Sequence, residues 1–174
     1  MAKVIIYCAI SLDGFLAAPN DDLSFLDLMH VEGEDYGYNS LKNRVDTIIM
    51  GRKTYDVVCA FGVPFPHADK TSFVLSNSRV GGDEEVFYLN EEAMRQMLIK
   101  KRVSETDQSV FADGGAELFQ WLIREKLVDE LILSIVPVLL GSGTRLFGET
   151  PTNLVLQNAQ SYSSGLVQLT YTFN

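Results

Sequence analysis

The sequence predicts an α/β fold in which a mostly parallel sheet is closed by an antiparallel hairpin. Apolar strand-like runs alternate with helical segments through the first three quarters of the chain, the pattern of a parallel sheet with crossover helices. Two late strand-like segments, 154–162 and 166–173, flank the hairpin turn Ser163-Ser164-Gly165. The length of 174 residues, with no repeat and no linker, predicts one domain spanning 1–174.

The remaining elements are predicted from apolar periodicity and from turn residues. They are strands over 3–10, 47–50, 71–76, 85–89, 109–112 and 130–140, and helices over 35–44, 53–59, 91–102 and 116–126. The first strand is continuously apolar after Lys3, which is typical of a strand covered on both faces. A shorter helical piece with an irregular joint is expected before residue 35. Two closely spaced prolines make 61–67 a loop, and Asn90 is expected to cap the helix that follows it.

The helix predicted over 116–126 carries a stripe of apolar side chains that would pack on the sheet. Leu118, Phe119, Leu122 and Ile123 form this stripe, and Trp121 is expected to flank it as part of the core. The strand over 130–140 is the longest apolar strand, and Pro137 interrupts it. These features indicate a layer of helices over a central sheet.

Composition and charge limit the classes of function. The hydrophobic content is 47% and the net charge is −9, which argues against nucleic acid or an anionic membrane as a partner. The chain enters its first strand at once, without the longer apolar stretch of a secretory signal, so a cytoplasmic protein is expected. Cys8 and Cys59 are interpreted as small buried hydrophobic residues without a disulfide, and no metal site is predicted.

The junction after the second predicted strand has the composition of a phosphate site. Gly51 gives an anion access to the first turn of a helix, where Arg52 and Lys53 add positive charge and Thr54 adds a hydroxyl. A capped surface helix is the alternative interpretation of this junction alone, because the pattern is neither a Walker motif nor a GxGxxG fingerprint.

Two further strand ends carry groups that suit anions. Ser76, Asn77 and Arg79 follow one predicted strand, although a polar turn would also explain them. Gly114 and Gly115 precede another helix and would allow close backbone contact with a pyrophosphate. Ligands of open α/β sheets gather at the carboxyl ends of the strands. The sequence therefore suggests a dinucleotide across this edge, with Arg52, Asn77 and Arg79 near a 2′-phosphate.

Several motifs together resemble the dihydrofolate reductase-like superfamily, closest to the carboxy-terminal reductase domain of the bifunctional riboflavin-biosynthesis deaminase/reductase. They are Ala9-Ile-Ser-Leu-Asp-Gly-Phe-Leu-Ala17, Met50-Gly-Arg-Lys-Thr-Tyr55, Val74-Leu-Ser-Asn77, Asp113-Gly-Gly-Ala-Glu-Leu118, Leu127-Val-Asp-Glu-Leu131, Pro137-Val-Leu-Leu-Gly-Ser-Gly143 and Leu146-Phe147. The resemblance covers nearly the whole chain in order. It implies a three-layer α/β/α domain around an eight-stranded mixed sheet, NADPH as hydride donor, and a pterin-like or pyrimidine-like substrate.

The resemblance also implies roles for the strand-end residues. Gly51, Arg52, Lys53 and Thr54 would bind the adenosine side and pyrophosphate, Ser76 and Asn77 the 2′-phosphate, and Gly114, Gly115, Ala116 and Glu117 the pyrophosphate. The peptide between Gly114 and Gly115 is expected to be cis, as is typical of the superfamily.

Hydride transfer to a C=N or C=O bond also needs a proton, for which two carboxylates and water are candidates. Asp35 lies near the helix before the Met50-Gly51-Arg52 motif, and a solvated helix residue is its alternative interpretation. Asp13 lies in the loop after the first strand, where a turn residue is the alternative. The early loop lacks the tryptophan expected of a folate enzyme. The aromatic side chains of Tyr36, Tyr38, Tyr55 and Phe61 suit either a substrate pocket or the core.

The leading hypothesis is an NADPH-dependent reductase of a heterocyclic small molecule. The first alternative is the 5-amino-6-(5-phosphoribosylamino)uracil reductase of riboflavin synthesis, although the chain has no deaminase domain. The second is an NADP(H)-binding module without turnover. A homodimer is expected, because the segment 132–140 and the late hairpin resemble the segments through which riboflavin-branch reductases pair.

Overall fold

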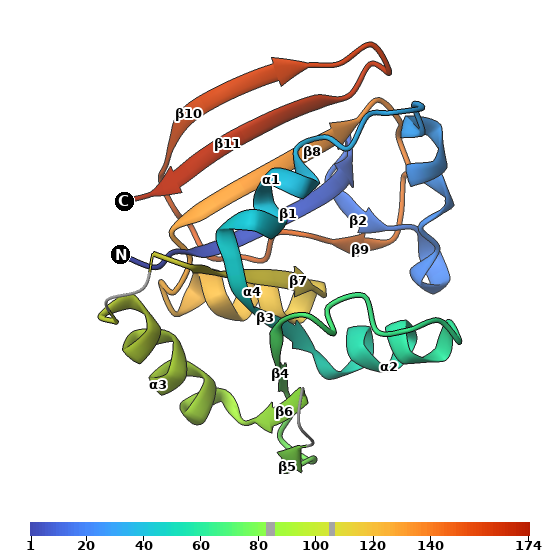
Figure 1. The fold of residues 1–174 in the computed structure, drawn as a ribbon. Coiled ribbons are helices and arrows are strands. Elements are labelled where there is room, and N and C mark those ends of the chain that lie inside the picture. Colours follow the sequence, from blue (N-terminus) through green and yellow to red (C-terminus); the bar gives the residue numbers. More distant parts are fainter. Residues whose placement is uncertain (83–85, 105–106) are drawn as a thin grey trace.

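The structure, a computed structural model that describes residues 1–82, 86–104 and 107–174, is organised around a nine-stranded sheet (Figure 1). Within those residues the strand order is β10-β11-β8-β1-β7-β3-β4-β6-β5. The strands are β1 Val4–Ser11, β3 Val45–Gly51, β4 Thr71–Leu75, β5 Gly81–Gly82, β6 Val86–Leu89, β7 Ser109–Gly114, β8 Glu130–Val136, β10 Leu154–Ser161 and β11 Val167–Phe173. Eight of these have four or more residues, which confirms the predicted sheet, and the two-residue β5 extends it.

Strand directions follow the predicted pattern. β1 pairs in parallel with β7 and β8, and β3 pairs in parallel with β4 and β7. The hairpin of β10 and β11 adds antiparallel strands beside β8. The prediction of a mostly parallel sheet with a closing antiparallel hairpin is therefore confirmed. The strand predicted from residue 85 starts at Val86 within the described residues, since residue 85 lies outside them.

Helices cover both faces of the sheet, so the domain has three layers. The helices are α1 Tyr38–Arg44, α2 Arg52–Ala60, α3 Glu91–Arg102 and α4 Ala116–Arg124, with 3₁₀ turns at Pro19–Asp21 and Ser24–Met29. Alternate side chains of β1 point to opposite faces, so Ile6 belongs to the core cluster that contains residues of α3 and α4, whereas Ile5 belongs to the cluster that contains Leu41 of α1. None of the described helices is both long and apolar enough to cross a membrane.

Element boundaries follow local chemistry. β8 stops at Val136, four residues before the predicted end, because Pro137 has no backbone N–H to continue the ladder. α4 stops at Arg124, since Lys126 takes a left-handed conformation with a φ of 55°. Asn90 caps α3 as predicted, and its side chain accepts a hydrogen bond from the Ala93 N–H at 2.9 Å.

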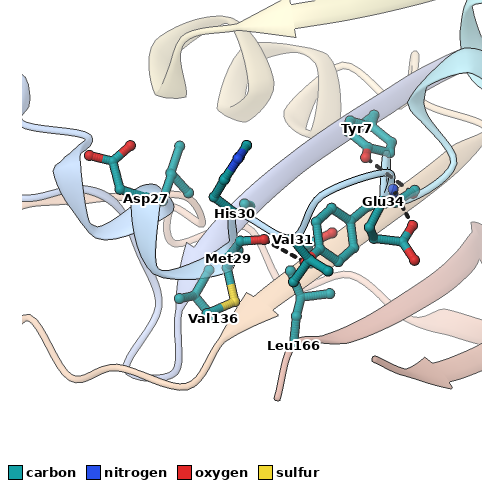
Figure 2. A pocket seen from close by; sticks show the side chains of 12 residues that line it. Tyr7, Asp27, Met29, His30, Val31, Glu34, Val136 and Leu166 are labelled. Carbon is teal, nitrogen blue, oxygen red and sulfur yellow. Dashed lines mark hydrogen bonds between the residues drawn. The ribbon is translucent and has the colours of Figure 1, made fainter. Parts of the chain in front are cut away.

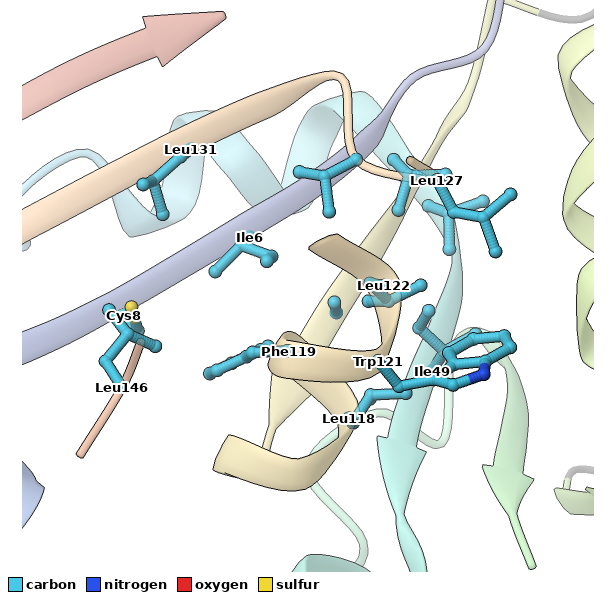
Figure 3. Close-up of a cluster of buried hydrophobic side chains, with 14 of the residues drawn as sticks. Ile6, Cys8, Ile49, Leu118, Phe119, Trp121, Leu122, Leu127, Leu131 and Leu146 are labelled. Atoms are coloured by element: carbon cyan, nitrogen blue, oxygen red, sulfur yellow. The ribbon is translucent and has the colours of Figure 1, made fainter. Parts of the chain in front are cut away.

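The core beneath α4 contains the predicted stripe of apolar side chains (Figure 3). Phe119 and Leu122 are fully buried against Ile6, and Trp121 is buried with them, as predicted. Cys8 belongs to this core, where burial raises the pKa of its thiol to about 12. The prediction of a buried Cys59 is wrong. This residue is exposed, and no side chain of α2 is completely buried.

A second, two-stranded sheet was not predicted. β2 (Phe15–Ala17) pairs in antiparallel fashion with β9 (Thr144–Arg145). Gly143 precedes β9 with a φ of 140°, and a Cβ there would lie 2.1 Å from the carbonyl oxygen of Ala17. Only glycine permits this approach, which joins the loop after β1 to the loop after β8.

Candidate active site

Three strand ends meet on one rim of the sheet. β7, β3 and β4 are neighbours, and all three run parallel, so their carboxyl ends lie at the same edge. The register pairs Met50 with Gly114 and Gly51 with Leu75. The three junctions that the sequence singled out are therefore adjacent in space, as their order along a parallel sheet predicts.

Gly51, Gly114 and Gly115, here called the glycine cradle, let the ends of β3 and β7 approach each other closely. A Cβ built on Gly51 would lie 3.5 Å from the Gly115 nitrogen, and one built on Gly115 would lie 3.0 Å from Thr54 Oγ1. Gly114 has a φ of 133°, and the Gly114–Gly115 peptide is cis, as expected. Gly51 and Gly115 stand at the N-caps of α2 and α4 without a side-chain cap. Backbone N–H groups there suit a pyrophosphate.

Two arginines share one carboxylate beside this cradle. Arg52 Nη1 donates to Asp56 Oδ2 at 2.9 Å, and Arg79 donates to both oxygens of Asp56 at 2.6 and 3.1 Å. The hydrogen bond from Arg79, together with the charge of both arginines, lowers the pKa of Asp56. The cluster therefore has a net charge of about +1 at neutral pH, the sum of two guanidinium groups and one carboxylate. Asp56 is a site residue that the sequence analysis missed, although its i, i+4 spacing from Arg52 was visible.

The remaining predicted cofactor residues lie around the cradle with different exposures. Ser76 is buried, and its hydroxyl accepts hydrogen bonds from the Ser78 and Arg79 N–H groups, so it shapes the turn. Asn77 is exposed in the same turn. Lys53 and Glu117 form an exposed ion pair of 2.9 Å that joins the first turns of α2 and α4, and Ala116 begins α4 beside them. The structure thus brings every predicted cofactor residue to one rim.

Asp13 holds two loops together. Its carboxylate accepts hydrogen bonds from the Ser11 hydroxyl at 2.6 Å and from the N–H groups of Gly141 and Leu140 at 2.7 and 3.1 Å. The bond from Ser11 is the largest cause, and with those from the backbone it lowers the pKa of Asp13 to about 2. This geometry favours the turn role that the sequence left open, because a carboxyl ionised at neutral pH has no proton to donate.

The depressed pKa of Asp13 predicts a pH dependence of stability. The folded-state pKa of about 2 lies below the unfolded value of about 3.9. The contribution of Asp13 to stability is therefore complete above about pH 4 and is lost as the pH falls toward 2. Asp13→Asn should flatten the stability profile between those pH values, measured by urea denaturation, whereas Asp21→Asn on the exposed surface should not. An unchanged slope in the Asp13 variant would contradict this prediction.

Asp35 caps the entry into α1. Its two carboxylate oxygens accept hydrogen bonds from the N–H groups of Gly37 and Asn39 at 2.9 and 3.0 Å. The bond from Gly37, followed by that from Asn39, lowers the pKa of Asp35. The side chain is exposed, which matches its alternative interpretation as a solvated residue at a helix.

Asp113 is a further carboxylate at the rim whose role the sequence did not predict. Asp113 directly precedes the glycine pair, and its Oδ2 lies 2.9 Å from Nε2 of His67, a hydrogen bond between β7 and the loop after α2. The His67 side chain is 3% exposed and that of Asp113 24%. The ring of His67 also packs edge-on against Phe111. The rule that strand carboxyl ends carry function could have identified Asp113, whereas nothing in the sequence near His67 predicted its partner.

A pocket of about 300 Å³ opens beside β1, the neighbour of β7 (Figure 2). It lies between the 3₁₀ segment Ser24–Met29 and the strands β1 and β8. Its lining consists of Tyr7, Ala9, Leu26, Asp27, Met29, His30, Val31, Glu34, Tyr36, Ser134, Val136 and Leu166. Of the four aromatic residues considered from the sequence, Tyr36 lines this pocket, Tyr38 and Tyr55 pack on a core cluster, and Phe61 is exposed.

Comparison with known proteins agrees with this architecture. A family model described as "RibD C-terminal domain" matches residues 101–168. The uncharacterized protein YwjB of Bacillus subtilis (strain 168) is 37% identical over 172 residues, which is 97% of each chain. A crystal structure named "Putative riboflavin biosynthesis protein", from Shewanella sp. PV-4, is 30% identical over 99% of both chains with a TM-score of 0.84.

A more distant structure has the same fold. The diaminohydroxyphosphoribosylaminopyrimidine deaminase/5-amino-6-(5-phosphoribosylamino)uracil reductase of Thermotoga maritima has a TM-score of 0.72 at 14% identity, over 99% of this chain and 57% of that one. The sheet order and these matches define a protein with the dihydrofolate reductase-like fold. Within that superfamily, the chain belongs to the RibD C-terminal domain branch.

Proposed function

We propose that this protein is an NADPH-dependent reductase that transfers a hydride to a heterocyclic small molecule. The observation that carries the proposal is the meeting of three anion-friendly strand ends on one rim, beside a strand that lines a pocket. Membership of a family that contains reductases supports it.

The rim residues fit the cofactor by charge and by their backbone donors. The backbone N–H groups that follow Gly51 and Gly115 would hold the pyrophosphate, since α2 and α4 begin there without a side-chain cap. Arg52 and Arg79, with a net positive charge beside Asp56, would hold the 2′-phosphate. Bound NADPH would supply the hydride. The chain's own residues would orient the cofactor and keep its phosphates at the rim.

The proton that accompanies reduction is best assigned to water. Both candidate carboxylates, Asp13 and Asp35, are occupied by backbone N–H donors, and their pKa values are lowered. An acid of this kind is ionised at neutral pH, so it orients the loops instead of donating a proton. Water that enters the pocket is not held by these backbone donors and can supply the proton.

Titration with NADPH tests the proposal directly. We expect a saturable complex with a dissociation constant in the micromolar range, as is usual for substrates of such enzymes. A panel of oxidised heterocycles should then reveal one that consumes NADPH. Consumption is measured as the loss of NADPH absorbance. Saturable binding with no turnover across the panel would favour the NADP(H)-binding module instead, and the absence of any complex would reject both interpretations.

We also propose that the protein is a homodimer that pairs through the late hairpin. β10 ends the sheet with eight residues, Leu154–Ser161, none of which carries a charge. Val155 and Leu156 are exposed on it. Monomeric proteins usually protect a long edge strand with charges, proline or a covering element. A second copy of the chain would cover this edge.

Leu156→Lys is therefore expected to convert a dimer into a monomer. The leucine is 52% exposed, and the substitution would place two related charges at the proposed interface. The measurement is mass by sedimentation equilibrium at micromolar concentration. Val103→Lys is the matched control, because Val103 is an exposed apolar residue at the end of α3. A wild-type monomer under these conditions would reject the proposed dimer.

A further inference from the structure

The charge of the pocket limits what it can accept. Its lining includes the acidic residues Asp27 and Glu34, together with His30, but among these described lining residues there is no lysine or arginine. Phosphate groups are normally recognised by arginine, lysine or a helix N-terminus. A phosphorylated ligand would lie against two carboxylates here, without a compensating cation.

One wall of the pocket is an aromatic ring that is fixed from several sides. Tyr36 has a φ of 54°, a left-handed conformation that is rare for residues other than glycine. Its N–H donates to Glu34 Oε1 at 2.8 Å, and its hydroxyl donates to the Met29 carbonyl at 2.5 Å. Its carbonyl accepts from the Tyr7 hydroxyl at 3.2 Å. Such over-determined residues cluster at functional sites.

The floor of the pocket contains a buried polar group. Ser134 of β8 is buried and lines the pocket, and its Oγ accepts a hydrogen bond from Gln168 Nε2 at 3.1 Å. Gln168 Nε2 also donates to the Tyr36 carbonyl at 2.9 Å. A serine hydroxyl keeps its own hydrogen as a donor. The floor therefore offers a directed polar contact to a ring nitrogen or carbonyl of a ligand.

From these features we infer that the substrate is a flat heteroaromatic compound that is neutral or cationic and carries no phosphate. This inference rests on the proposed reductase function and names its substrate class. The volume of about 300 Å³ suits one or two fused rings. Tyr36 would flank the ring, and the two carboxylates would favour positive charge or N–H donors. The 5-phosphoribosylamino-pyrimidine of the alternative function does not match this lining.

The test uses three bicyclic probes of similar shape that differ in charge: 1-methylquinolinium, quinoline and 1-naphthyl phosphate. Binding to the full chain is measured by calorimetry at pH 7.5. We expect the cation to bind most tightly, the neutral ring less tightly, and the phosphate at least tenfold more weakly than the cation. In Asp27→Asn/Glu34→Gln, affinity for the cation should fall roughly three- to tenfold, while quinoline stays within about twofold. Glutamine at position 34 retains an acceptor for the Tyr36 N–H.

Asp21→Asn/Glu91→Gln is the matched control, because it removes the same charge from exposed positions outside the pocket lining. This control should bind all three probes as the wild type does. The inference is overturned if 1-naphthyl phosphate binds as well as the cation, if the double pocket variant leaves cation binding unchanged, or if no probe binds. NADPH titration of the same preparation separates the two proposals: probe binding without NADPH binding rejects the reductase and leaves the pocket assignment in place.

Discussion

Arg52→Ala is expected to weaken NADPH binding by about 1.5–3 kcal/mol, or roughly 10- to 150-fold, and to spare NADH. The guanidinium of Arg52 lies at the rim with Arg79, where the two share Asp56. Asp56 cannot neutralise both arginines, so one positive charge remains for a phosphate. NADH lacks the 2′-phosphate and would lose no contact. Equilibrium titration with NADPH and with NADH, monitored by nicotinamide fluorescence, measures the two affinities.

Arg124→Ala is the control for this experiment. Arg124 is an exposed arginine in the last turn of α4, at the opposite end of that helix from the glycine cradle. Its loss should leave both affinities unchanged, which excludes a general effect of net charge on an acidic chain. Equal weakening of NADPH and NADH by Arg52→Ala would show that Arg52 does not recognise the 2′-phosphate, and would move that role to Arg79 or Asn77.

The fold was predictable because its determinants are local. The apolar run of β1, the Asn90 cap of α3 and the Ser163-Ser164-Gly165 turn each act over a few residues, and the structure contains all three elements. The β2–β9 pair was not predictable in this way. Its strands have three and two residues, too few for a periodic signal, and they depend on a backbone approach at Gly143 between distant segments.

The candidate site also contains some features that local sequence predicts and others that depend on long-range contacts. The glycines and cations at the strand ends follow from the rule that parallel sheets bind ligands at their carboxyl edge. The i, i+4 spacing of Arg52 and Asp56 is local, but the contacts of Asp56 with Arg79 and of Asp113 with His67 join residues 23 and 46 positions apart, which no single-sequence pattern specifies. The same holds for the pocket, whose walls come from the first and last thirds of the chain. Long-range contacts therefore bring together site residues and pocket walls that local motifs do not predict.

Phe119→Ala is expected to lower the free energy of unfolding by about 3–5 kcal/mol, because it removes an aromatic side chain from a closed core. Phe119 is 1% exposed and packs in the cluster beneath α4. A Cβ on Gly114 would lie 3.9 Å from the tip of its ring, so Phe119 also supports the glycine cradle from below. Loss of the ring should therefore weaken NADPH binding as well as stability, although Phe119 is not among the proposed cofactor ligands.

Phe119→Leu separates the two effects, since it should cost less than about 1.5 kcal/mol and keep the chain folded. Stability is measured by urea denaturation, and NADPH affinity by titration of the folded variant. Val103→Ala, at a position that is 79% exposed, should change stability by no more than about 0.5 kcal/mol. If Phe119→Leu remains folded and binds NADPH as the wild type does, the cradle is rigid without support from the core. A weaker complex would instead link the packing of α4 to the shape of the cradle, because both depend on the same ring.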